Sequence, residues 1–216
     1  MPFVWWVTAP PEQSRPLALR ANIFVSALLG AGAVLVLAGC GHSLLRISAV
    51  ATPIARILTL AAGLVGVPCA VWLCVCAFWF VRGRKTGFYT LLSFCLYPVW
   101  LCLRAVSVFS RAPVNANDSV TLAALFCPVV LAYGWFCLLG ALANGGRTDK
   151  AFYPALLACV LLSVCVGLPT ALVCARSGDA AACAFFLADA FCGAAAALFA
   201  ADTRPSRKGA SADAQQ

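Results

Sequence analysis

Long runs of apolar residues alternate with short polar segments along this 216-residue chain. A helix needs about 20 apolar residues to cross the hydrocarbon of a bilayer. Six runs reach that length, and they are continuous rather than alternating, which disfavours a β-barrel. The pattern therefore predicts an all-α fold, a polytopic transmembrane helix bundle of six spans. The predicted spans are residues 21–41, 57–81, 87–110, 120–143, 151–175 and 180–201.

Polar ends flank this membrane domain. Residues 1–20 are predicted to form a cytoplasmic N-terminal tail, and residues 21–201 the six-helix transmembrane domain. Residues 202–216 are predicted to form a disordered cytoplasmic C-terminal tail, because their small and polar residues bury too little apolar surface to order a chain. The gaps between the spans are short, so no soluble domain is expected.

The positive charges give the predicted bundle a direction. Lys and Arg beside the spans concentrate on the cytoplasmic side of membrane proteins. The segments outside the six spans fall into two sets, one with ten Lys and Arg residues and the other with four. Both termini belong to the richer set, which predicts an N-in, C-in topology. The ten are Arg15, Arg20, Arg82, Arg84, Lys85, Arg147, Lys150, Arg204, Arg207 and Lys208, and the four are Arg46, Arg56, Arg111 and Arg176.

Composition supports the membrane assignment. Hydrophobic residues make up 63% of the chain and charged residues 10%, whereas soluble domains average about 25% charged residues. In water such a surface would aggregate, so the lipid bilayer is the expected partner. The net charge of +8 does not predict nucleic-acid binding, because the basic residues are spread among the membrane flanks. The default location is a bacterial cytoplasmic membrane as a multi-pass cell-membrane protein; a viral or organellar membrane is left open.

Two ionisable residues interrupt otherwise apolar spans, Arg104 in the third and Asp189 in the sixth. Such a residue costs at least about 2.5 kcal/mol on insertion scales, so it usually pairs or lines a wet cavity. From the helical rise, Arg104 lies roughly 9 Å and Asp189 roughly 13 Å below the outer end of its span. An arginine side chain covers that difference, which makes Arg104 and Asp189 a candidate intramembrane polar pair. It would serve as a gate, a substrate-binding pair or a proton-coupled site; the alternative is a structural pair, or an arginine that reaches the headgroups beside a neutral aspartate.

The thirteen cysteines are expected mainly as small apolar packing residues, and no metal site is predicted. Cys174 and Cys183 flank a short predicted outer loop and form a candidate disulfide if that side is oxidising. Asn117 begins an Asn-Asp-Ser triplet in another predicted outer loop. The triplet is a weak glycosylation sequon that applies only in a eukaryotic secretory pathway.

An internal repeat is a further candidate feature. Residues 59–62, Thr-Leu-Ala-Ala, match residues 121–124, and Phe88-Tyr89 match Phe152-Tyr153, at offsets of 62 to 64 residues. Parallel two-helix repeats would relate the second and third spans to the fourth and fifth, as in some transporters. Apolar sequences also match by chance. Pro68, Pro98, Pro128 and Pro169 lie inside the second to fifth predicted spans, and residues 41–56 are expected to hold an interfacial helix.

Catalysis is not expected. The chain has one histidine, His42, and one glutamate, Glu12, and Asp189 is the only aspartate in a predicted span. General acid–base chemistry needs such groups near a cavity. No cofactor motif is found, so neither a cofactor nor a catalytic residue is predicted.

Two functions remain as hypotheses. The first is a small-solute permease, a channel or the membrane subunit of a transporter, favoured by the short-looped spans, the prolines and the two intramembrane charges. The second is a non-catalytic structural or assembly protein that organises a partner complex, favoured by the scarcity of polar groups and by small residues at helix-packing spacing, such as Ser26 and Gly30. The partner would be a second copy of the chain or a membrane subunit.

Overall fold

The computed structural model describes residues 22–50, 52–82, 95–111, 119–143 and 152–202, and these are almost entirely helical. Five of its helical rods are long and apolar enough to cross a membrane, so the chain is a multi-pass membrane protein with an all-α fold. The rods are α2 (Ile23–Leu45), α3 (Pro53–Arg82), α6 (Ser119–Ala143), the continuous α7–η2–α8 (Phe152–Val160, Leu161–Val166 and Gly167–Ser177) and α9 (Ala180–Asp202).

The third predicted span is the one that differs. Its described helix, α5, covers Leu96–Arg111, only 16 residues, whereas the prediction began at residue 87. Residues 83–94 lie outside the described part of the chain. At about 1.5 Å per residue, this helix is roughly 24 Å long, less than the hydrocarbon thickness of about 30 Å.

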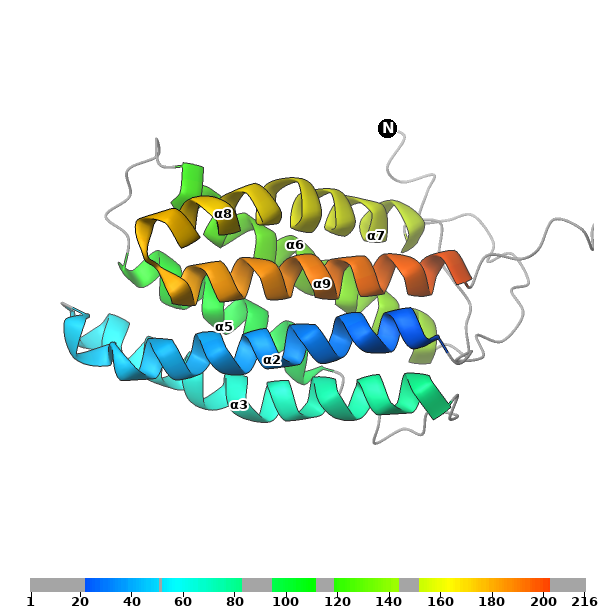
Figure 1. Ribbon diagram of the computed structural model, residues 1–216, viewed down its shortest axis with the longest axis horizontal. Helices are drawn as coiled ribbons and strands as arrows, with labels where there is room; N and C mark the ends of the chain where they lie inside the picture. Colours follow the sequence, from blue (N-terminus) through cyan, green and yellow to red (C-terminus); the bar gives the residue numbers. More distant parts are fainter. Residues whose placement is uncertain (1–21, 51, 83–94, 112–118, 144–151, 203–216) are drawn as a thin grey trace, which may run out of the picture.

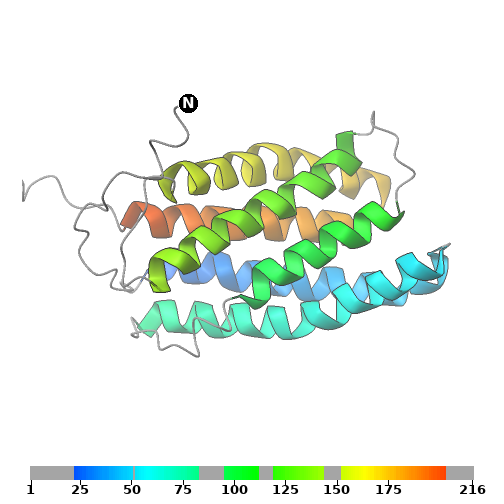
Figure 2. The same cartoon turned by 180° about the vertical axis from the view of Figure 1, so that it is seen from behind.

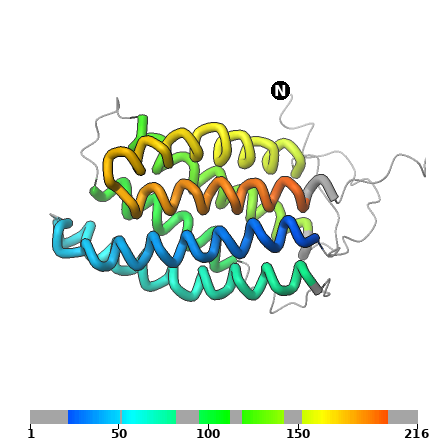
Figure 3. The backbone as a smooth tube through the Cα atoms, in the orientation of Figure 1, coloured from blue at the N-terminus to red at the C-terminus, as the bar shows by residue number. Residues whose placement is uncertain are grey.

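The helices run up and down along one long axis and form two layers. Helices α7–α8, α9, α2 and α3 lie side by side in the front layer of Figure 1, and α5 and α6 cross behind them, as the reverse view in Figure 2 shows. Helix α2 packs against both α3 and α9, while α5 packs against α3 and α6. The turn between α2 and α3 and the turn between α8 and α9 lie at the same end of the molecule (Figure 3). We call this the Gly178 end.

Side-chain caps and a glycine mark where several helices begin and end. Asn22 caps α2, because its side-chain oxygen accepts from the backbone N–H groups of Phe24 and Val25 at 3.0 and 3.2 Å. Gly178 ends α8 with φ of 79°, a left-handed conformation that favours glycine. Asp179 then caps the N-terminus of α9, since its Oδ1 accepts from the N–H of Ala182 at 3.1 Å. Helices α8 and α9 therefore form a tight hairpin.

The prediction of a separate interfacial helix within residues 41–56 is wrong. Helix α2 continues to Leu45, a short 3₁₀ turn covers Ile47–Ala49, and α3 begins at Pro53. Proline is well placed in a first helical turn because it has no N–H to leave unpaired. The side chain of Arg56 reaches back and donates to the carbonyl oxygen of Val50 at 2.6 Å, which closes the turn.

The outside of the bundle is apolar, as a lipid-facing surface requires. Leu45 is 84% exposed and Phe24 is 77% exposed, and many other large apolar side chains are exposed along the helices. The interior is closely packed around Trp100, which is fully buried. Its indole N–H donates to the carbonyl oxygen of Ala62 at 3.0 Å, so α5 is tied to α3. Gly66 makes room for this ring, since an added Cβ would lie 2.7 Å from the indole nitrogen.

The four prolines lie in helices, as expected, whereas Gly30 does not make the close helix contact expected of it. Pro68 and Pro128 are inside α3 and α6, and Pro98 is the third residue of the described helix α5. Pro169 follows the π-helical segment η2. A Cβ added to Gly30 would meet no atom within 4 Å, so this glycine makes no close helix contact with the described part of the chain.

Candidate functional site

The structure brings Arg104 and Asp189 together. Arg104 projects from α5 and Asp189 from α9, and the guanidinium Nη1 donates to Asp189 Oδ1 at 3.0 Å. A second bond joins Nη2 to Oδ2, so the contact is bidentate. The side chain of Arg104 is 6% exposed and that of Asp189 is fully buried. The pair links two helices from different layers of the bundle.

Aromatic rings complete the surroundings of the guanidinium. Its central carbon lies 5.3 Å from the ring centroid of Trp100 and 5.1 Å from that of Phe185. Both distances are within the range of cation–π attraction, which is stronger where water is excluded. The Trp100 and Phe185 rings also meet each other at 5.8 Å. The cation is thus held by one carboxylate and two ring faces.

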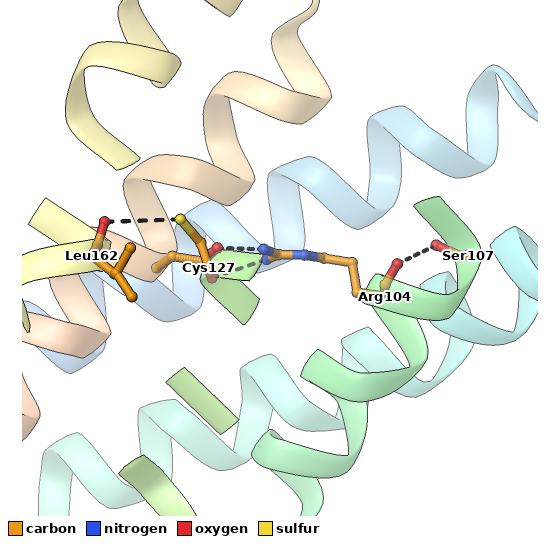
Figure 4. A network of polar contacts seen from close by, with 5 residues as sticks. Arg104, Ser107, Cys127 and Leu162 are labelled. Carbon is orange, nitrogen blue, oxygen red and sulfur yellow. Dashed lines mark hydrogen bonds and ion pairs between the residues drawn. The ribbon is translucent and has the colours of Figure 1, made fainter. Parts of the chain in front are cut away.

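Neighbouring polar contacts hold the helix backbones around the pair. Figure 4 shows the hydroxyl of Ser107, which donates to the Arg104 carbonyl oxygen at 2.8 Å. It also shows Cys127 of α6, whose thiol lies 3.8 Å from the carbonyl oxygen of Leu162 in the π-helical segment. The second contact joins α6 to the region where the α7–α8 rod departs from α-helical geometry, a departure that is common at functional sites.

A half-open pocket connects the Gly178 end with this pair. Its volume is about 310 Å³, and Arg104 and Ser107 lie on its inner wall. Helices α2, α5, α6 and α9 enclose it. Its lining residues are Ser43, Arg104, Ser107, Val108, Arg111, Val120, Thr121, Ala124, Asp179, Ala181, Ala182, Phe185 and Phe186.

A second pocket of about 480 Å³ adjoins the first and shares Ser43, Arg111, Asp179 and Ala181 with it. It is more polar, since His42 and Arg46 line it as well. We call the two pockets together the vestibule.

Arg111 is anchored within the vestibule. Its Nε donates to the hydroxyl of Thr59 at 3.0 Å, and its Nη2 donates to the same oxygen. Thr59 is 2% exposed and donates in turn to the carbonyl oxygen of Ala55 at 2.6 Å. The last residue of α5 is therefore fixed to the first turns of α3.

The other predicted site residues do not join this site. Cys174 and Cys183 are both thiols in the structure, so no disulfide joins them here. Cys174 is buried in a small cluster that includes Cys127 and Phe186, and Cys183 packs against that cluster. Asn117 and both predicted tails, apart from Asp202 at the end of α9, lie outside the described residues, as do Phe88 and Tyr89 of the predicted repeat.

Sequence reasoning missed several members of the site although a signal was present. Trp100 precedes Arg104 by four residues, and Phe185 precedes Asp189 by four. Side chains four residues apart share a helix face, so each charge had an aromatic neighbour that could have been named. Thr59 carried no comparable signal, because only the approach of α5 to α3 brings Arg111 beside it.

No metal centre is found in the described ranges, where no three His, Cys, Asp or Glu side chains gather closely enough to hold an ion.

Comparisons with known proteins identify no family. No protein-family model matches the chain. Searches of curated proteins and of solved structures likewise found no significant match. The site therefore stands on its own geometry.

Proposed function

We propose that the chain is a six-span, N-in and C-in permease that takes up a small solute from the Gly178 end. The observation that supports this most is the pocket that runs from that end to the buried Arg104–Asp189 pair. A bundle whose role is only to pack has no need for a pocket that ends at a buried arginine, and charges inside membrane spans often mark solute pathways.

The remaining parts of the proposal follow from the chain's topology. With six spans, the Gly178 end faces outward, and the vestibule is open to the outer solution. We further propose that the second and third spans are related to the fourth and fifth as parallel two-helix repeats. The bacterial cytoplasmic membrane is the proposed location, which suits uptake into the cell.

The pair is proposed to act as a polar gate between the vestibule and the inner half of the bundle. Asp189 balances the charge of Arg104 while the pocket is empty, and Trp100 and Phe185 close the space around the guanidinium. Transport would then require the α5–α9 contact to open, because this contact forms the inner wall of the pocket.

Uptake by purified protein in proteoliposomes tests the proposal. A library of labelled solutes is presented, and at least one is expected to accumulate above protein-free vesicles. For that solute, Arg104→Ala and Asp189→Asn should each lower the initial rate at least tenfold. Arg176→Ala, in the exposed last turn of α8, is the control and should transport normally.

Two results would count against a permease. Failure of every solute to accumulate, with the protein correctly inserted, would favour the assembly hypothesis, whose own test is a stoichiometric partner recovered from detergent. Unchanged uptake in both variants would remove the pair from the transport mechanism.

A further inference from the structure

The charge balance of the vestibule has a definite sign. Arg46 and Arg111 line it, and Asp179 is the single acidic residue among its lining residues. The deeper Arg104 is already neutralised by Asp189. One positive charge is therefore in excess where the pocket meets the outer solution, and an anion would be attracted there.

Arg111 has donors left for such an anion. A guanidinium carries five N–H donors in a planar fork that matches the two oxygens of a carboxylate or phosphate. Thr59 accepts from Nε and Nη2 of Arg111. Among the described residues, the other donors have no acceptor, and Arg111 makes no ion pair with Asp179. Thr59 thus fixes the position of the guanidinium and leaves several of its N–H donors for a ligand.

The wall beside Arg111 is apolar. Val108 lies on α5 about one turn before Arg111, and Phe185 and Phe186 face the pocket from α9. Val120 and Ala124 of α6 complete this side. The volume of about 310 Å³ is at the lower end of the range of small-molecule sites, so only a compact apolar group fits.

We propose that the solute is a small organic anion, with its oxyanion on Arg111 and its apolar group against Phe185 and Phe186. That the bound anion is transported rests on the proposed permease function. Binding of the anion at Arg111 does not depend on transport. The same chemistry describes a soluble carboxylate and the headgroup region of an acidic lipid. The interior position of the pocket, among α2, α5, α6 and α9, favours the soluble source.

Binding is tested by isothermal titration calorimetry on the purified full-length protein in phosphatidylcholine nanodiscs. The probe is benzoate, with benzamide as a neutral ligand of the same shape. Benzoate should bind at least tenfold more tightly than benzamide. Arg111→Gln should weaken benzoate binding roughly 10- to 100-fold, the range expected for a hydrogen bond to a charged group. Arg176→Gln, whose side chain lines neither pocket, should bind as the unaltered protein does.

A second variant controls for the possibility that Arg111→Gln disturbs folding. Ala124→Leu keeps the Arg111–Thr59 contact but fills the apolar side of the pocket, so it should also abolish benzoate binding. Equal binding of benzoate and benzamide, or benzoate binding that neither variant weakens, would overturn the proposal.

Further measurements separate the source of the anion and the role of the site. Displacement of benzoate by phosphatidylglycerol in the nanodisc would assign the site to an acidic lipid, and its absence would assign it to a soluble anion. Benzoate bound at Arg111 without any uptake would sustain this inference while the permease fails. Uptake of a neutral or cationic solute, with no benzoate binding, would support the permease and overturn the anion site.

Discussion

Among single residues, Arg104 shows most clearly how a charge is accommodated inside an apolar helix bundle. Asp189 supplies two acceptors, and the rings of Trp100 and Phe185 cover the remaining faces of the guanidinium. A buried ion pair of this kind is weak support for stability, because taking both charges out of water costs about as much as their attraction returns. Its removal one partner at a time is a different matter, since the other charge then stays buried alone.

This asymmetry gives a prediction for the pair. Arg104→Met or Asp189→Leu alone should lower the free energy of unfolding by about 3–5 kcal/mol, because each leaves one buried charge unpaired. The double variant should recover most of that loss. Thermal or denaturant unfolding in detergent micelles measures it, with Arg176→Met as the exposed control. Additive losses in the double variant would mean that the two side chains do not depend on each other.

Among the helices, α5 is positioned by one large side chain and one missing side chain. Trp100 inserts between α5 and α3 and donates to the Ala62 carbonyl, and Gly66 leaves the space that the indole occupies. The ring also stacks near Tyr97, at 5.9 Å. Because α5 carries Arg104 and Arg111, this contact sets where both arginines lie relative to α9 and α3.

Glycine substitutions test that packing. Gly66→Ala places a Cβ against the Trp100 indole nitrogen and the Cys40 sulfur, so it should cost roughly 1–3 kcal/mol of unfolding free energy, as overpacking does. Gly30→Ala is the matched control, since it has open space around it and should be neutral or slightly stabilising. Equal effects of the two substitutions in a thermal melt would refute the role of Gly66.

Across the molecule as a whole, the ends of the described helices gather at two opposite ends of the long axis. The α2–α3 turn, the α8–α9 turn and the neighbouring ends of α5 and α6 lie at the Gly178 end (Figure 1), and residues of both turns line the vestibule. The first residues of α2 and α7 and the last residues of α3, α6 and α9 lie at the opposite end (Figures 1 and 2).

Reporter fusions check the topology directly. Fusions at Lys85, Lys150 and Gln216 should remain cytoplasmic, while those at Ala116 and Gly178 should be exported. The reason is the ten-to-four distribution of basic residues across six spans. A cytoplasmic signal at Ala116 would refute the six-span topology, and with it the outward direction of the vestibule.

The order of apolar and polar residues was enough to locate most of the helices, because the bilayer requires each crossing segment to satisfy its own backbone hydrogen bonds within a long apolar run. The ends of α6 and α9 were predicted to within one residue, and Arg104 and Asp189, which form a buried pair, had been named as a candidate pair. Which helices are neighbours, and therefore which side chains meet, became known only from the folded bundle, since hydropathy carries no information on lateral packing. Contacts such as Gly66 with Trp100 and Arg111 with Thr59 depend on the shapes of two helices at once, and they place the vestibule and its arginine.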